Sequence, residues 1–175
     1  MRRFLPRLVI STSATDPRRG AIRTPAGFIP CALGRSSIHR FKREGDGATP
    51  LGRWRAVAVF WRPDRLRRPA ALLPGRALRA ADGWCDDPAD RHYNRPVRLP
   101  FAASHERLWR EDHLYDVVVV LDYNLARPRP GAGSAIFLHI AKPEFAPTEG
   151  CIAVTPAAMR RLLATIGPGT VFDVR

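Results

Sequence analysis

The chain has 175 residues, a net charge of +13 and 45% hydrophobic residues. This length fits a single domain, residues 1–175, that can bury a real hydrophobic core. No apolar run approaches the roughly 20 residues of a membrane-spanning helix, so we expect no membrane span. Pro6 and Arg7 interrupt the basic N-terminal segment. The apolar stretch that remains is shorter than the about 7–15 apolar residues that a signal peptide requires. We therefore recognise no signal peptide in this chain.

The positive charge comes almost entirely from arginine, because Lys42 and Lys142 are the only lysines. Such a surface attracts nucleic acid, anionic membranes or an acidic polymer such as cell wall. No helix-turn-helix, zinc-finger or aromatic RNA-binding signature accompanies the charge, so we predict no nucleic-acid partner. A solvated basic surface is the simpler interpretation, and a polyanion-binding surface is the alternative.

The first third of the chain reads as strands and turns. We predict strands over residues 7–13, 21–23 and 27–33, the last two forming a hairpin around the Pro-Ala-Gly of residues 25–27. Residues 43–52 carry three glycines and a proline, which predicts a loop. Residues 54–61 follow as a strand with β-branched Val57 and Val59.

The middle, residues 62–100, is rich in proline and has no clear periodicity. Within it, residues 82–95 contain Trp84 and Tyr93, which could anchor an ordered loop that covers the functional site as a lid. We expect residues 104–110 to form a helical turn.

Regular patterns return after residue 115. Residues 116–123 contain the apolar run Val117–Leu121, typical of a strand buried on both faces. In the strand predicted over 135–140, alternation places Ala135, Phe137 and His139 on one face, and Ile136, Leu138 and Ile140 on the other.

One helix is predicted, and it directly follows the segment around Cys151. Thr155 and Pro156 suit its first positions, and an apolar stripe ends before Gly167. Residues 170–174 close the chain as a strand, so strands dominate and the expected fold class is mostly β.

The three cysteines, Cys31, Cys85 and Cys151, are far apart, odd in number and never form a C-x-x-C pair. This pattern argues against a disulfide framework and a structural zinc site, and we expect neither a metal nor a cofactor. A free cysteine is ordinarily a small buried hydrophobic residue.

Cys151 has neighbours that favour reactivity. It follows Thr148-Glu149-Gly150, and His139 precedes it by twelve residues. A thiol needs a nearby base to become a thiolate, and imidazole is the usual one. Taken alone, His139 would be interpreted as a core histidine, but with Cys151 nearby the pair is better interpreted as a cysteine nucleophile and its base.

Residues 134–154 resemble the catalytic segment of the YkuD-type L,D-transpeptidases, in which a histidine precedes a Ser/Thr-His-Gly-Cys block. His139, Thr148, Gly150 and Cys151 match this pattern, and residues 47–52 resemble the Thr-Pro-x-Gly element of the family. The chain departs from the pattern in three ways: Glu149 replaces the second histidine, the residues at 153 and 154 are apolar, and the loop before Thr148 is shorter. These departures indicate a divergent branch.

The resemblance implies a mixed β-sandwich with little helix and a reaction on peptidoglycan stem peptides. Cys151 would attack the carbonyl between the third residue and D-alanine of a stem tetrapeptide, release D-alanine, and pass the acyl group to an amine of a stem or protein. His139 would serve as acid and base, and the N–H groups of Gly150 and Cys151 would face the oxyanion. The family also implies a location in the cell envelope, in the periplasm.

Five residues are candidates for substrate binding: Thr148, Glu149, Tyr93, Asn94 and Arg95. For the last three, hydrogen bonding within their own loop is the alternative, and Glu149 could instead be a solvated charge. Two other functions stay open. The enzyme could be a carboxypeptidase or hydrolase with water as acceptor, or the chain could be a non-catalytic basic module that binds cell wall.

Overall fold

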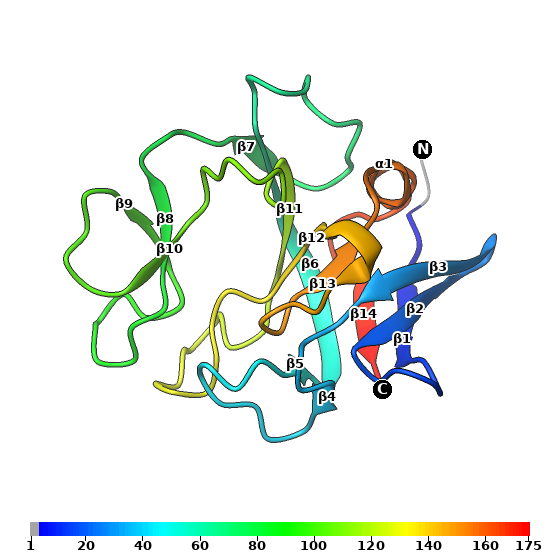
Figure 1. Cartoon of the computed structure of the whole chain (residues 1–175). Coiled ribbons are helices and arrows are strands. Elements are labelled where there is room, and N and C mark those ends of the chain that lie inside the picture. Colours follow the sequence, from blue (N-terminus) through cyan, green and yellow to red (C-terminus); the bar gives the residue numbers. More distant parts are fainter. Residues whose placement is uncertain (1–3) are drawn as a thin grey trace.

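The computed structural model describes residues 4–175, so the first three residues of the N-terminal segment lie outside it. Strands account for 37% of the chain and helices for 6%, which makes the fold mostly β. Figure 1 shows its elements. The bounds are β1 Arg7–Thr12, β2 Arg19–Thr24, β3 Gly27–Ala32, β4 Ile38–His39, β5 Thr49–Pro50, β6 Gly52–Trp61, β7 Gly75–Ala77, β8 Asp82–Cys85, β9 Pro96–Arg98, β10 His105–Arg107, β11 Val117–Leu121, β12 Phe137–Ile140, the short 3₁₀ helix Pro143–Phe145, β13 Ile152–Val154, α1 Pro156–Leu163 and β14 Val171–Val174.

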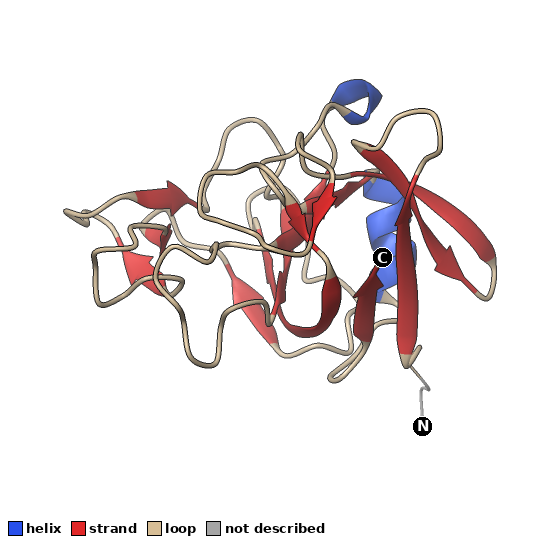
Figure 2. Ribbon diagram, turned by 90° about the horizontal axis from the view of Figure 1, so that it is seen from below, coloured by secondary structure: helices blue, strands red, loops and turns tan. Residues whose placement is uncertain are grey.

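Nine strands form one sheet in the order β11-β12-β13-β3-β2-β1-β14-β6-β7. The sheet closes on itself because β6 also pairs with β11. Its two layers are compatible with a β-sandwich, and the mostly β expectation is confirmed. Figure 2 shows α1 alongside these strands.

The sheet buries apolar side chains on both of its faces. On one face, strands and α1 enclose the larger cluster, which includes Leu8, Phe172 and Met159. The other face carries a smaller cluster, which includes Trp84, Val118 and Phe137. Every residue of β11 is buried, as the continuous apolar run predicted, and every residue of β12 is buried as well.

Beside this second face lies a three-stranded sheet in the order β10-β8-β9, visible at the left of Figure 1. Trp84 of β8 packs edge-on against Phe137, with ring centroids 5.1 Å apart. The segment predicted as a loop over 82–95 therefore begins as a strand.

The seven strands predicted from the sequence are all present, with ends shifted by a few residues. The helix also begins as predicted, because Thr155 caps it by accepting a hydrogen bond from the Ala158 N–H at 3.2 Å. In the described chain, no helix is long and apolar enough to cross a membrane.

Two local predictions are wrong. Residues 104–110 do not form a helical turn, because β10 pairs there with β8 and the sheet overrides the local preference. The helix also does not follow Cys151 directly. The short strand β13 intervenes and pairs with both β12 and β3.

Candidate active site

The pairing of β12 with β13 brings His139 and Cys151 to the same face of the sheet. The two strands are parallel, and His139 lies opposite Ala153. Side chains alternate along a strand, so Cys151, two residues before Ala153, points to the same side as His139. Both residues line one cavity of about 380 Å³.

The thiol of Cys151 is buried and hydrogen-bonded to the backbone of the segment before it. It donates to the Ala135 carbonyl at 3.2 Å and accepts from the Phe137 N–H at 3.4 Å. Burial raises the pKa of Cys151 to about 12, and the negative charge of Glu106 adds to this effect. The sulfur therefore keeps its proton at neutral pH.

His139 is buried as well, and its ring is held from two sides. Its Nδ1 lies 2.8 Å from the Ile140 carbonyl, which can only accept, so Nδ1 carries the proton and Nε2 is the free base. Tyr115 packs edge-on against the ring, with centroids 5.2 Å apart. Burial lowers the pKa of His139 to about 4, so the imidazole is neutral at neutral pH.

Thr148 holds the turn that presents Cys151. Its hydroxyl donates to the Cys151 carbonyl at 2.6 Å and accepts from the Gly150 N–H at 3.1 Å. Gly150 has a φ of +129°, and a Cβ there would lie 2.6 Å from the Ala48 carbonyl oxygen. The turn thus requires glycine, because a side chain would meet both backbone strain and a clash.

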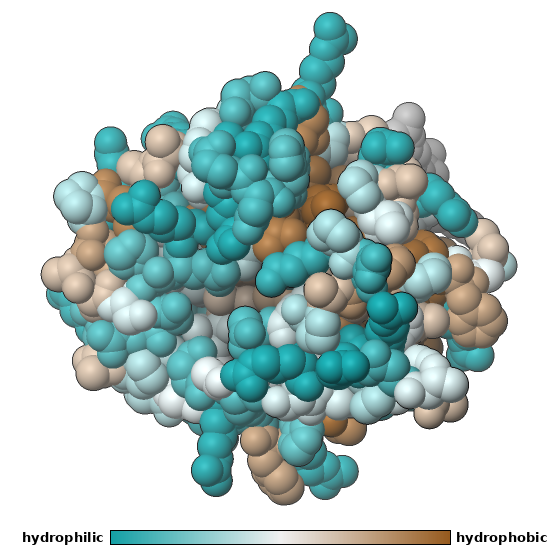
Figure 3. Space-filling model, in the orientation of Figure 1, coloured by the Kyte–Doolittle hydropathy of each residue, from teal (hydrophilic) through white to brown (hydrophobic). Residues whose placement is uncertain are grey.

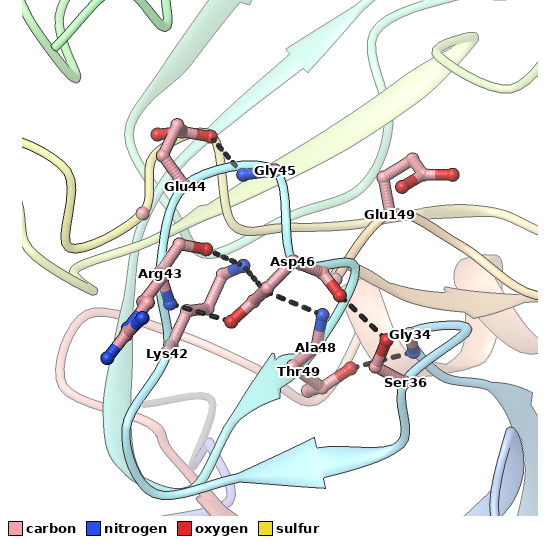
Figure 4. Close-up of polar contacts among 12 residues, drawn as sticks. Gly34, Ser36, Lys42, Arg43, Glu44, Gly45, Asp46, Ala48, Thr49 and Glu149 are labelled. Atoms are coloured by element: carbon pink, nitrogen blue, oxygen red, sulfur yellow. Dashed lines mark hydrogen bonds and ion pairs between the residues drawn. The ribbon is translucent and has the colours of Figure 1, made fainter.

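The loop before β5 packs against this turn, because Ala48 and Lys42 lie next to Gly150. Lys42, whose side chain is 3% exposed, donates to Asp46 at 2.7 Å, and Figure 4 shows the two groups facing each other. Asp46 also accepts from the backbone N–H of Ala48 at 2.8 Å. The Lys42 Nζ lies 3.4 Å from the position that a Cβ on Gly150 would take. A partly buried ion pair therefore fixes the loop that contacts the Gly150–Cys151 segment.

The five predicted substrate-binding residues fall into two groups. Thr148 and Glu149 line the cavity, and Glu149 is largely exposed and pairs with Arg35 at 2.8 Å. The other three do not line it.

Tyr93, Asn94 and Arg95 instead make contacts within the protein. The Tyr93 hydroxyl donates to Glu44, and the Asn94 and Arg95 side chains donate to backbone carbonyls of residues 123–126. These bonds tie the β8–β9 connection to the segment that leads into β12. A role in substrate binding stays a prediction for all five residues.

The cavity also contains residues that the sequence did not single out. The carboxyl groups of Glu44, Asp86 and Glu106 line it together with Ser134 and Tyr115. Asp86 and Glu106 come from the small sheet and its turns, far from Cys151 in the sequence, so no spacing rule points to them. Only the loop that contains Glu44 could have been noticed in the sequence, because residues 47–52 of this loop resemble the Thr-Pro-x-Gly element.

A thiol and a neutral imidazole that line one cavity are the two groups that nucleophilic catalysis by a cysteine uses. The fold and the site together define a domain in which a nearly closed β-sheet holds a buried thiol and a neutral imidazole at one cavity.

The chain belongs to the YkuD family, whose model, the L,D-transpeptidase catalytic domain, matches residues 12–174. Members of this family are cysteine-dependent L,D-transpeptidases with peptidoglycan-related functions, and they are typically found in the cell envelope. Searches of curated proteins and of solved structures give no significant match.

Proposed function

We propose that this chain is an active L,D-transpeptidase that works on peptidoglycan stem tetrapeptides in the cell envelope. The observation that carries the proposal is the placement of Cys151 and His139 on one face of adjacent parallel strands, where they line a common cavity. The match of residues 12–174 to the catalytic domain of the family supports the same reaction class.

Acylation begins from a neutral thiol and a neutral imidazole. As the Cys151 sulfur attacks the carbonyl of the third stem residue, Nε2 of His139 takes the thiol proton. The Ile140 carbonyl, which accepts the Nδ1 proton, keeps Nε2 available and stabilises the imidazolium that forms. The C–N bond then breaks, His139 protonates the departing amine, and D-alanine leaves a thioester on Cys151.

Deacylation reverses these proton transfers. An acceptor amine attacks the thioester and gives a proton to His139, which returns it to the departing sulfur. The new amide bond and the free thiol complete the cycle.

The backbone N–H of Cys151 is the better candidate to stabilise the oxyanion. The Gly150 N–H already donates to Thr148, whereas in the described chain the Cys151 N–H makes no turn or loop hydrogen bond. One well-aimed donor contributes about 3–4 kcal/mol to the transition state. Gly150 then acts by its backbone conformation, and Thr148 by holding the turn.

The test is intact-mass spectrometry of the protein with a stem tetrapeptide, with D-alanine measured in parallel. We expect an adduct with the mass of the tripeptide acyl group on the wild type and none on Cys151→Ala. Cys151→Ser should be nearly inactive, because one histidine deprotonates a hydroxyl far less readily than a thiol.

The same assay separates the alternatives. Supplying an amine acceptor distinguishes transfer from hydrolysis, since a carboxypeptidase would release free tripeptide and leave the amine unused. If the wild type forms no adduct and releases no D-alanine, yet binds peptidoglycan in a salt-dependent way, the chain is a basic binding module and the +13 charge is the functional feature.

A further inference from the structure

A second cavity lies on the other side of β12 from the cavity that contains Cys151. Its volume is about 480 Å³, which is within the range of pockets that hold small molecules. His139 and Ile140 are neighbours in β12, and side chains alternate along a strand, so His139 lines the first cavity while Ile140 lines the second. The two cavities share no lining residue. The second cavity is therefore a separate site from the one assigned to the reaction.

The wall of this second cavity is mostly apolar. It is built from the segment after β6, the strands β11 and β12, and α1, and its hydrophobic side chains include Leu66, Pro69, Val117, Ile140, Met159 and Leu163. The last four belong to the larger hydrophobic cluster, so the cavity borders the core. Figure 3 shows hydrophobic residues at the surface between the positions of β11 and α1. An apolar wall of this kind favours a ligand with a hydrocarbon part.

Two arginines of the lining have no ionic partner in the described chain. They are Arg67, in the segment after β6, and Arg160, in α1; both are exposed, and neither takes part in an ion pair. Asp116 is the only acid among the lining residues that the structure describes, and its carboxylate is already occupied. It accepts a hydrogen bond from Arg65 at 2.7 Å and lies 2.8 Å from Nδ1 of His113. The edge of the cavity thus carries two guanidinium groups that can bind an anion.

An anion with an apolar tail matches both features of the cavity. A guanidinium group binds a carboxylate through paired, charge-assisted hydrogen bonds. The apolar wall gains free energy when a hydrocarbon chain leaves water and covers it. An inorganic anion would leave the wall uncovered, and a cation would be repelled by the two arginines.

We propose that this cavity binds a single-chain anionic amphiphile of the fatty-acid class. The hydrocarbon chain lies against Ile140, Met159 and Leu163, and the carboxylate is held at Arg67 and Arg160. This site goes beyond the proposed function, because none of its residues lines the cavity of Cys151.

The first experiment is isothermal titration calorimetry of the whole chain with decanoate below its micelle concentration. We expect one molecule to bind per chain. Hexanoate, which is four methylenes shorter, should bind at least about 10-fold more weakly, because each fully buried methylene contributes about fourfold to the affinity. Decan-1-ol, which keeps the chain and lacks the charge, should also bind about 10-fold more weakly. The proposal is overturned if decanoate does not bind, or if it binds no better than hexanoate or the alcohol.

The two arginines are tested together in the variant Arg67→Gln/Arg160→Gln. Its affinity for decanoate should fall about 10-fold, while its affinity for decan-1-ol stays unchanged. The matched control is Arg127→Gln/Arg161→Gln, which removes the same charge from two exposed arginines that do not line the cavity. It should bind decanoate as the wild type does. An equal loss in this control would mean that net charge, rather than the cavity, attracts the anion, and would refute the site.

Filling the cavity provides a test that leaves the charges in place. Ala70 lines the cavity and is exposed, so Ala70→Trp can fill the space without displacing core side chains. Decanoate should raise Tm of the wild type, because it binds the folded state, and should leave Tm of Ala70→Trp unchanged. A lowered Tm in both proteins, or equal binding to both, would count against the proposal. Because these measurements require no turnover, their outcome is independent of the proposed reaction.

Discussion

Replacing Lys42 by methionine tests whether its partly buried ion pair with Asp46 holds the loop that contacts the Gly150–Cys151 segment. The Lys42 Nζ donates to Asp46 at 2.7 Å and to the Arg43 carbonyl at 3.2 Å. Its hydrocarbon chain packs against Gly133. Methionine keeps most of this apolar contact and removes the ammonium, so the substitution isolates the charge.

The expected loss of stability follows from what remains around Asp46. Breaking a fully buried ion pair costs about 3–5 kcal/mol, because the remaining charge is left unpaired. Asp46, however, keeps hydrogen bonds from the N–H groups of Arg43 at 2.6 Å and Ala48 at 2.8 Å, and its side chain is 26% exposed. We therefore expect a loss of about 2–3 kcal/mol, which lowers Tm by about 4–12 °C in a domain of this size.

The loss should depend on pH in a direction set by Asp46. Burial disfavours its charge, but the bonds from the Arg43 N–H, Lys42 and the Ala48 N–H outweigh this and hold the pKa of Asp46 below its ordinary value of 3.8. A lowered folded-state pKa gives stability that is fully present above 3.8 and is lost as the pH falls through the folded value. The wild type and Lys42→Met should thus converge in Tm only at strongly acidic pH.

Thermal unfolding followed by circular dichroism measures this effect. Lys142→Met is the matched control, because Lys142 is the other lysine of the chain and is exposed. It should stay within about 0.5 kcal/mol of the wild type. The reasoning is refuted if Lys42→Met is as stable as this control. A double-mutant cycle with Asp46→Asn should also return a coupling energy of at least about 1 kcal/mol.

Three further substitutions or treatments probe the site directly. Gly150→Ala should cost at least about 1–3 kcal/mol in thermal unfolding and abolish acylation, because its Cβ would lie 2.6 Å from the Ala48 carbonyl oxygen at a φ of +129°; an active, stable variant would contradict this. His139→Ala should lower the rate of D-alanine release by about 10²–10⁴ with the fold retained, the usual range for lost acid–base catalysis. Iodoacetamide should label Cys151 ahead of the other two cysteines, since Cys151 is the cysteine that lines the cavity, and the rate should rise steadily with pH because the pKa of the thiol is about 12; a rate that levels off below pH 8 would show that a thiolate is already formed.

Much of the scaffold of the site could be predicted from local patterns. Alternation over 135–140 predicted that His139 and Phe137 lie on the face opposite Leu138. The structure agrees, because side chains along a strand point alternately to its two faces. Thr155 and Pro156 marked the helix start because capping chemistry is local. The motif within residues 134–154 indicated the family, and the match over residues 12–174 confirms the family.

The parts that could not be predicted depend on contacts between distant segments. Strand β13 is three residues long and exists because β12 and β3 supply partners on either side. Asp86 and Glu106 reach the cavity only because β8 and β10 pair beside the main sheet. No periodicity connects such residues to Cys151, and their acidity runs against the net charge of +13. The face drawn in Figure 3 is largely hydrophilic, with hydrophobic residues scattered over it.

The neutral resting state of the pair has a consequence for how the chemistry begins. Burial raises the pKa of Cys151 to about 12 and lowers that of His139 to about 4, so both groups are neutral at neutral pH. In the proposed reaction, charge separation accompanies attack, when the oxyanion would gain the Cys151 N–H and the imidazolium would keep its bond to the Ile140 carbonyl. In the proposed reaction, activation of the thiol therefore depends on the substrate, and by itself the thiol reacts only slowly with alkylating agents and oxidants at neutral pH.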